Sequence, residues 1–331
     1  ELKAFVSAGV SEEKTPSPTT IKTTGERRLV VACPPEREYE LTLLLSRFKF
    51  TLEVNKVVSL KVLPYLQALS KGGLVWLEGL GQITKSLLDE PGLLDNRRVF
   101  LRLNFDDIIS GLITSLQLTK VTDIIIESIF HRDQLVLFRP NFKAGTKIHI
   151  LPRPIDLTRF RERPDPGGSK IAVIGTNGHF SGLLEAFSAY RDLKAEKNES
   201  LLYFLGPIKN SFLETALTHF VNSNSLSGSI YIQDKVTDLA TFLADKDYFL
   251  SCPLAVGAPG PAEAILMGLK PLLKDVPGMA ELYPPEWLWR NTRQLVERFD
   301  HPPDHEKAYK LVISRHDPEW LYKYYLSVLT S

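Results

Sequence analysis

The sequence predicts an α/β protein made of two doubly wound, Rossmann-like domains that face each other across a cleft, with helices at the C-terminal end. Three observations lead to this prediction. The chain has 331 residues, which fits two domains of about 150 residues each. Short apolar runs alternate with amphipathic segments, as in parallel strands covered by helices on both faces. A segment rich in charge, Pro and Gly interrupts this alternation near the middle.

The first series of alternating segments begins at Arg28. RRLVVACP has the apolar run of a buried strand, and EREYELTLLLSRF has apolar positions three and four residues apart, as in a helix. The further predicted strands are KGGLVWLEGLG, RRVFLRLNF, TDIIIESI and KIHILPRPI, and the further predicted helices are DDIISGLITSLQLT and RDQLVLFR. This order predicts a first α/β domain over residues 28–158.

The second series follows the segment RFRERPDPGGSK, within which we predict a linker over residues 159–169. The predicted strands are KIAVIGT, SLLYFLGP, GSIYIQD, DYFLSCP and LKPLLKD, and the predicted helices are FSGLLEAFSAYRDLKAE, NSFLETALTHFVNS, VTDLATFLADK and GPAEAILMG. Strands and helices in strict alternation predict a doubly wound domain over residues 170–300.

Two aromatic-rich segments close the chain, and residues 301–331 are predicted to be a helical tail. PPEWLWRNTRQLVERF and DPEWLYKYYLSVLTS both have the pattern of helices. Their aromatic residues recur at helical spacing, which is typical of core contacts; they are Trp287, Trp289, Trp320, Tyr324 and Tyr325. Residues 1–27 have the composition of a linker and begin without Met, so we expect the chain to be part of a longer polypeptide.

Composition excludes several classes of protein. Hydrophobic residues make up 44% and charged residues 24%, with a formal net charge of +1, which argues against a disordered chain and against nucleic acid as a partner. The apolar stretches are interrupted well before the ~20 residues that a transmembrane segment needs. Cys33 and Cys252 both lie in strand-like sequence, so we expect buried thiols in a reducing, cytoplasmic location.

Loops after the strands of the second series hold the candidate binding residues, because ligands of such sheets bind at the carboxyl ends of the strands. These candidates are Gly175, Thr176, Asn177, Gly178, His179, Lys209, Lys235, Gly257 and Glu263. The backbone amides of the GTNGHF loop would suit a phosphate, although its glycines also fit an ordinary tight turn. The lysines also fit solvated surface charges, and a helix dipole alone would stabilise the Glu263 carboxylate.

The first series offers weaker candidates for catalysis. Glu78 ends a predicted strand, and Asn104 and Asp106 follow another. Asp106 and its neighbour Asp107 equally fit the N-cap of the next helix, and Glu78 equally fits a surface charge. His131 follows a strand and could face the cleft, but no second His or Cys stands at metal-ligand spacing. We find neither a zinc pattern nor a P-loop and expect no metal site.

From Lys147 to about Trp289, the order of these motifs resembles the retaining GT-B glycosyltransferases of the GT4-like group. ILPRPIDLTRF resembles the linker of that family, and KIAVIGT with LLEAFSAYRDL resembles its first donor-domain strand and helix. AEAILMGLKPLLKDVPGMAELYP is similar to its Glu-Ala helix, Gly turn, Pro-led strand and Gly-rich return loop. VWLEGLG and VFLRLNF resemble acceptor-domain strands of the same group.

The resemblance implies a retaining, metal-independent transfer of a sugar from a UDP- or GDP-sugar to a glycan or other sugar acceptor, without a cofactor. It also implies a last helix that packs back on the first domain. Glu263 matches the second glutamate of the family's E-x7-E motif, which binds the ribose hydroxyls. The first glutamate of that motif falls on Ala255. The family's phosphate-binding Arg and Lys fall on Thr176 and Ser181, and its acceptor-side His falls near Asn104.

Two alternatives stay open at this point. The departures at Ala255, Thr176 and Ser181 fit a catalytically inactive GT-B module with a binding or assembly role in a glycan-building protein. The architecture alone also fits a two-domain protein that closes on a free sugar.

Overall fold

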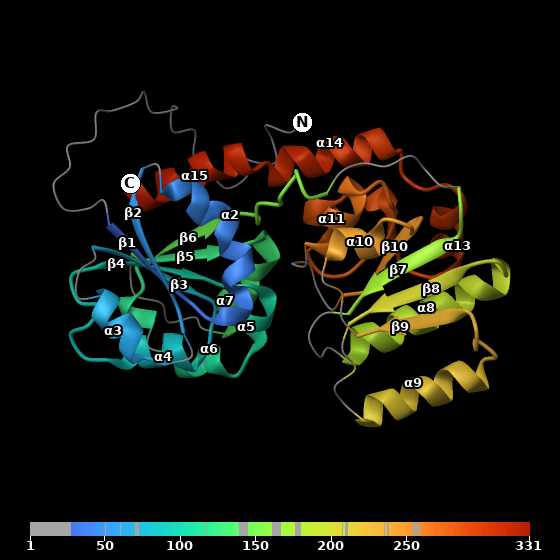
Figure 1. Ribbon diagram of the computed structural model, residues 1–331, viewed down its shortest axis with the longest axis horizontal. Coiled ribbons are helices and arrows are strands. Elements are labelled where there is room, and N and C mark those ends of the chain that lie inside the picture. Colours follow the sequence, from blue (N-terminus) through green and yellow to red (C-terminus); the bar gives the residue numbers. More distant parts are fainter. Residues whose placement is uncertain are drawn as a thin grey trace.

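Two parallel β-sheets, each sandwiched between helices, make up the protein (Figure 1). The computed structural model describes residues 28–49, 51–59, 61–69, 73–116, 118–138, 145–160, 167–175, 180–206, 208, 211–234, 236, 238–253, 256 and 259–331. Within these residues each sheet has six strands, and every strand pair in both sheets is parallel. The predicted fold class, two doubly wound α/β domains, is confirmed.

The first sheet has the strand order β2-β1-β3-β4-β5-β6. Its strands are β1 (Arg28–Cys33), β2 (Glu53–Val58), β3 (Leu74–Glu78), β4 (Arg98–Arg102), β5 (Asp123–Ile126) and β6 (Lys147–Ile150). The helices between them are η1 (Pro35–Arg37), α2 (Glu38–Phe48), α3 (Leu63–Leu69), α4 (Gln82–Asp89), α5 (Phe105–Ile109), α6 (Leu112–Ser115), η2 (Leu118–Lys120) and α7 (Ile129–Phe138).

Side chains of the first sheet alternate between two apolar cores. Val30 and Ala32 of β1 face a core that includes residues of α3, α4, α5 and α7. Leu29, Val31 and Cys33 face a second core, formed with α2 and with the C-terminal helix. Both faces of the central strands are therefore buried, which explains why these strands have continuous apolar sequences rather than alternating ones.

The second sheet has the strand order β12-β11-β10-β7-β8-β9. Its strands are β7 (Lys170–Ile174), β8 (Leu201–Leu205), β9 (Ile230–Gln233), β10 (Tyr248–Ser251), β11 (Lys270–Lys274) and β12 (Leu288–Trp289). The helices between them are α8 (Phe180–Glu196), α9 (Ser211–Ser223), α10 (Leu239–Leu243), α11 (Gly260–Leu266), α12 (Met279–Leu282) and η3 (Pro285–Trp287). One core packs α8, α9 and α13 (Thr292–Asp300) on the sheet, and another packs α10, α11 and α14 (His305–His316) on its opposite face.

The chain ends by crossing back from the second sheet to the first. α14 packs on α11 of the second half, whereas α15 (Pro318–Thr330) packs on α2 of the first half, so the two helices form one layer over both sheets (Figure 1). Tyr325 of α15 is fully buried, and its ring centroid lies 5.8 Å from that of Trp76 on β3. The prediction that the last helix packs back on the first domain is thus confirmed.

Several local predictions were incomplete or wrong. DDIISGLITSLQLT, predicted as one helix, is divided into α5 and α6 around Ser110, whose backbone is extended. PPEWLWRNTRQLVERF, also predicted as one helix, contains η3 and the short strand β12 before α13. β2, α3 and α4 were not predicted as elements, whereas α14 lies within the predicted helical tail. Of the aromatic stripe, Trp320 and Tyr324 are exposed rather than buried.

A buried ion pair stabilises the far side of the first sheet. Asp123, at the start of β5, accepts hydrogen bonds of 2.9 Å from Arg98 Nε and from His149 Nε2. Burial alone would raise the pKa of Asp123, but the hydrogen bonds from His149, Arg98 and Thr122 outweigh it and hold the pKa well below its usual value. The carboxylate form of Asp123 is therefore favoured in the folded protein.

We expect Asp123→Asn to lower the free energy of unfolding at pH 7 by about 3 kcal/mol, because it breaks a buried ion pair. Since folding lowers the Asp123 pKa, its contribution is present above the unfolded pKa and is lost as the pH falls from about 5. Urea unfolding between pH 7 and pH 3 should thus show a steeper acid loss in the parent than in the variant. Asp133→Asn, at an exposed position, is the control. Equal acid dependence in parent and variant would contradict this account.

Candidate functional site

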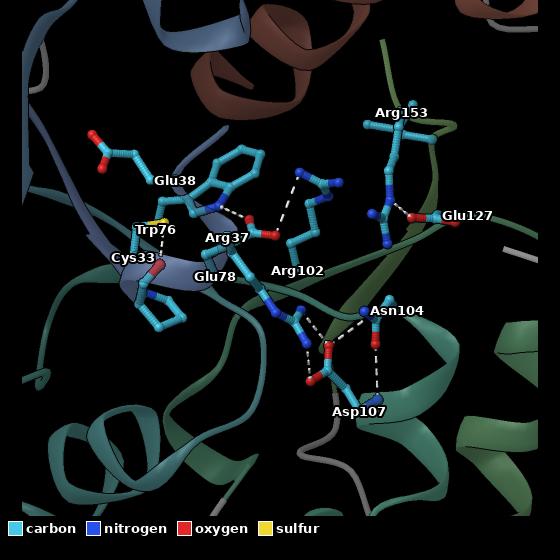
Figure 2. Close-up of polar contacts among 12 residues, drawn as sticks. Cys33, Arg37, Glu38, Trp76, Glu78, Arg102, Asn104, Asp107, Glu127 and Arg153 are labelled. Carbon is cyan, nitrogen blue, oxygen red and sulfur yellow. Dashed lines mark hydrogen bonds and ion pairs between the residues drawn. The ribbon is translucent and has the colours of Figure 1, made fainter. Parts of the chain in front are cut away.

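The carboxyl edge of the first sheet carries a group of polar side chains around its topological switch point. In the order β2-β1-β3-β4-β5-β6 the direction of winding reverses between β1 and β3, and crevices at such points bind ligands in open α/β sheets. Cys33 ends β1, Glu78 ends β3 and Arg102 ends β4. Figure 2 shows these residues with the arginines and carboxylates around them.

Arg37 and Asp107 fill this switch point. Arg37 donates two hydrogen bonds, of 2.7 and 2.8 Å, to the two carboxylate oxygens of Asp107 (Figure 2). Asp107 also accepts from the backbone N–H of Leu80 at 2.8 Å. The guanidinium of Arg37 lies against Gly79, where φ is +71° and an added Cβ would come within 2.3 Å of Arg37 Nη1. Glycine is required here both by the backbone conformation and by the close approach.

Asn104 caps helix α5. The sequence offered Asp106 or Asp107 as the N-cap residue, so the expected cap is present but a neighbouring residue forms it. The Asn104 side chain accepts from the backbone N–H of Asp107, and the Asp107 side chain accepts from the backbone N–H of Asn104, each at 2.9 Å (Figure 2). This is a capping box. Asp106 lies in the first turn of α5 and is exposed.

Glu78 is buried, contrary to one of the expectations for it. Its side chain is only 1% exposed, accepts a 2.9 Å hydrogen bond from Trp76 Nε1 and lies 3.4 Å from Arg102 Nη1 (Figure 2). It is therefore not a surface charge. The indole and the guanidinium compensate for the loss of hydration that burial of a carboxylate entails.

Two further groups complete this edge. Arg153, beyond β6, forms an ion pair with Glu127, the residue that follows β5 (Figure 2). Burial raises the pKa of the Cys33 thiol to about 12, with the nearby carboxylate of Glu78 adding to the effect. A thiol with this pKa is inert near neutral pH. Cys252 is also free and buried, so both cysteines are as predicted.

The second sheet brings helix α8 close to its own switch point. In chain order its strands are arranged 3-2-1-4-5-6, and winding reverses between β7 and β10. A Cβ added to Gly182, in the first turn of α8, would lie 2.6 Å from the carbonyl oxygen of Cys252, which follows β10. A Cβ on Gly175, at the end of β7, would lie 2.5 Å from the Phe204 ring. The start of α8 therefore packs directly on the reversal point.

Glu263 lies in the first turn of α11, the helix that follows β10, as predicted. Five residues of this seven-residue helix are buried, whereas Glu263 is half-buried. Lys274, at the end of β11, forms an ion pair with Glu185 of α8. Burial lowers the pKa of the Lys274 ammonium group. The remaining predicted donor-side residues lie outside the described residues; they are Thr176, Asn177, Gly178, His179, Lys209, Lys235 and Gly257.

The carboxyl edges of the two sheets face each other. Helix α7, which follows β5, contacts Val256 and Glu281, which follow β10 and β11. His131 of α7 is fully buried in this contact and does not line an open cleft. Sequence reasoning missed Glu281, Arg37 and Arg102, because nothing in their spacing marks a partner that is distant in the chain.

No group of three or more His, Cys, Asp or Glu side chains among the described residues could hold a metal ion. No helix in the described part of the chain has both the length and the apolar character needed to cross a membrane.

Solved structures of glycosyltransferases share this architecture. A glycosyltransferase from Rickettsia africae matches with a TM-score of 0.69 and 12% identity, over 92% of this chain and 98% of that one. Anabaena HepE, in complex with UDP-glucose, matches with a TM-score of 0.68 and 12% identity, over 92% and 99%. AviGT4, a glycosyltransferase involved in avilamycin A biosynthesis, matches with a TM-score of 0.63 and 12% identity, over 92% and 97%.

The chain has a GT-B glycosyltransferase fold. No protein-family model matches the sequence, and no curated protein sequence matches it. In the GT-B arrangement, the polar edge of the first sheet and the start of α8 in the second lie on the sides of the two domains that face each other.

We expect Asp107→Asn to lower the free energy of unfolding by about 3 kcal/mol, because the variant leaves Arg37 without its counter-charge in a largely buried position. Urea unfolding at pH 7 measures the change. Asp95→Asn, an exposed position between β3 and β4, is the control and should stay within about 0.5 kcal/mol of the parent. A loss as small as that of the control would show that the Arg37–Asp107 pair does not stabilise this edge.

Proposed function

We propose that the chain transfers a sugar from a nucleoside diphosphate sugar, with uridine or guanosine as the nucleoside, to a glycan or other sugar acceptor. The observation that carries the proposal is the packing of the first turn of α8 on the end of β10, through Gly182, at the switch point of the second sheet. The N-terminus of such a 17-residue helix offers unpaired N–H groups and a positive dipole end, which suit a diphosphate. The solved complexes of Anabaena HepE with UDP and with UDP-glucose support the same choice.

We assign the donor to residues 170–300, the acceptor to residues 28–158 and the hinge to the linker at 159–169. Glu263 is the proposed ribose ligand, because a carboxylate can accept hydrogen bonds from both hydroxyls of a diol. Gly175 and the loop that follows it are proposed to surround the diphosphate, and the other donor-side residues named from the sequence belong to the same proposed site. The two free, buried thiols favour a reducing compartment, and we propose a cytoplasmic location.

The proposed reaction retains the anomeric configuration and uses no metal ion. The acceptor hydroxyl attacks the anomeric carbon on the face from which the diphosphate departs, the bond from that carbon to the diphosphate oxygen breaks, and the hydroxyl proton passes to the departing diphosphate. The amides at the start of α8 stabilise the negative charge that develops on this leaving group. Asp106, exposed in the first turn of α5, and Asn104 are the proposed acceptor-side groups. Glu78 is not proposed to touch substrate, because Trp76 and Arg102 enclose it.

Isothermal titration with UDP, GDP and a panel of their sugars tests the donor assignment. We expect either the uridine or the guanosine nucleotides to bind with a dissociation constant below about 1 mM, which corresponds to about 4 kcal/mol of binding free energy. Release of the free nucleotide on addition of saccharide acceptors then tests transfer. Absence of binding by every nucleotide at millimolar concentration would contradict the proposed function.

Glu263→Gln should weaken UDP or GDP binding by about tenfold to a hundredfold, the effect of losing a hydrogen bond to a charged group. If the carboxylate binds the ribose, the parent should prefer the ribonucleotide over its 2′,3′-dideoxy form, and the variant should lose most of this preference. Glu286→Gln, at an exposed position in the same half, is the control. A preference that stays unchanged in Glu263→Gln would remove Glu263 from the ribose site.

A catalytically inactive binding module is the second candidate. It is favoured by the pairing of the buried carboxylates Glu78 and Asp107 with arginines and by Ala255 at the position of the family's first glutamate. Nucleotide binding without turnover of any donor would support it. In that case Thr176→Arg combined with Ser181→Lys should strengthen binding without producing activity, whereas hydrolysis or transfer by the parent would exclude this candidate.

A further inference from the structure

A carboxylate from the second half of the molecule lies at the N-terminus of helix α7 of the first half. The carboxylate of Glu281, on α12, accepts from the backbone N–H of Ile129 at 2.7 Å and from that of Phe130 at 2.8 Å. The first N–H groups of a helix have no partner within it, and the positive end of the helix dipole favours a negative charge there. One carboxylate thus satisfies two of these groups with charge-assisted hydrogen bonds.

His131, the next residue of α7, binds a second loop of the other half. Its Nε2 lies 2.8 Å from the carbonyl oxygen of Val256. Because a carbonyl only accepts, Nε2 carries the proton of this hydrogen bond. Nδ1 is buried and has no hydrogen-bond partner among the described residues. The ring also stacks on Phe105 of α5, with centroids 5.7 Å apart and planes inclined by 20°.

Apolar side chains also link the two halves of the molecule beside these hydrogen bonds. Phe130 packs against the core of the second half, and a Cβ added to Gly278 would lie 2.9 Å from Phe130 Cβ and 2.4 Å from Val256 Cγ1. We call this group, Ile129, Phe130 and His131 with Val256, Gly278 and Glu281, the α7 junction. Val256 lies between β10 and α11, the helix that carries Glu263, whereas Gly278 lies between β11 and α12 and Glu281 lies in α12.

We propose that Glu281 and His131 are positioning residues, which hold α12 and Val256, the latter shortly before the helix that carries Glu263, against the first half before the donor binds. This inference rests on the proposed function, because it assigns a role to contacts beside the proposed ribose ligand. Preorganisation raises affinity because the apparent dissociation constant scales inversely with the fraction of molecules already in the competent arrangement. Loss of the junction should therefore weaken nucleotide binding without any loss of a direct contact to the nucleotide.

One pair of variants tests the Glu281 contact of the junction, and another pair tests the His131 contact. Glu281→Ala removes both acceptors, whereas Glu281→Gln keeps one oxygen. His131→Phe keeps an aromatic ring beside Phe105 but removes the donor to Val256, whereas His131→Gln restores an N–H donor on a shorter, flexible side chain. Glu286→Gln and His219→Gln, both at exposed positions, are the matched controls.

Hydrogen exchange without nucleotide and titration with UDP and GDP provide the readouts. We expect Glu281→Ala and His131→Phe to speed amide exchange at residues 129–131 and in α11, and to raise the nucleotide dissociation constant by about tenfold. The urea midpoint of each half should change little. We expect partial recovery in Glu281→Gln and in His131→Gln, a recovery that a merely structural role for these side chains does not predict.

The outcomes distinguish this inference from the proposed function. If the parent binds a nucleotide and Glu281→Ala and His131→Phe bind it equally well, the positioning role is overturned while the proposed function stands. If the parent binds no nucleotide, the proposed function fails and the positioning role fails with it. Unchanged exchange in Glu281→Ala, in a parent that binds nucleotide, would also overturn the inference, because the junction would then not hold α12 and Val256 in place.

Discussion

The chain runs between the two halves of the molecule twice, once after β6 and once before α15. The buried side chain and backbone of His316 link these two segments by hydrogen bonds. His316, the last residue of α14, lies with its Nδ1 2.7 Å from the carbonyl oxygen of Arg153, and its own carbonyl accepts from the N–H of Ile155 at 3.3 Å. Burial lowers the pKa of the imidazole, so the ring is neutral and donates through Nδ1. The outgoing segment after β6 and the returning segment before α15 are thus fixed to each other, and the facing of the two sheet edges depends on this crossing.

The crossing also explains why so much charge is buried near the first sheet. α15 covers the face of β1 and β3, and Tyr325 donates to the carbonyl of Pro152 at 3.2 Å. Any polar side chain beneath this helix has to find its partner inside the protein, since water is excluded. Trp76, Glu78 and Arg102 meet this requirement together. Removal of one charged member would leave the other charge uncompensated. The polar groups of these residues are therefore used to pair with one another rather than with a ligand.

The sequence predicted those features that depend on neighbours in the chain. Continuous apolar runs indicated the central strands, and apolar spacing predicted α8 over Phe180–Glu196 with the bounds that the structure has. β2 was missed because it is an edge strand with a polar, largely exposed sequence, so it lacks the apolar run of a buried strand. Features that depend on distant partners were not predictable in this way.

The polar site illustrates the same limit. In sequence, Glu78 is a carboxylate at a strand end, and nothing nearby shows that Trp76 and Arg102 enclose it. Asn104 was considered as a weak catalytic candidate near the position of a missing histidine, whereas its amide forms a capping box with Asp107. Glu281 lies in a motif that resembles a Gly-rich return loop, but its partners, the amides of Ile129 and Phe130, are more than 150 residues away.

The two switch points are filled in different ways, and this contrast favours the second sheet as the nucleotide side. Between β1 and β3, the crevice is occupied by Arg37 and Asp107, so a ligand there would have to break a bidentate ion pair. Between β7 and β10, glycines allow the backbone of α8 and of the strands to approach closely, and the helix N-terminus supplies the polarity. The N–H groups in the first turn of a helix have no acceptor within the helix, so in general they suit a phosphate group. Lys274, by contrast, is already paired with Glu185, and its charge is partly neutralised before any ligand arrives.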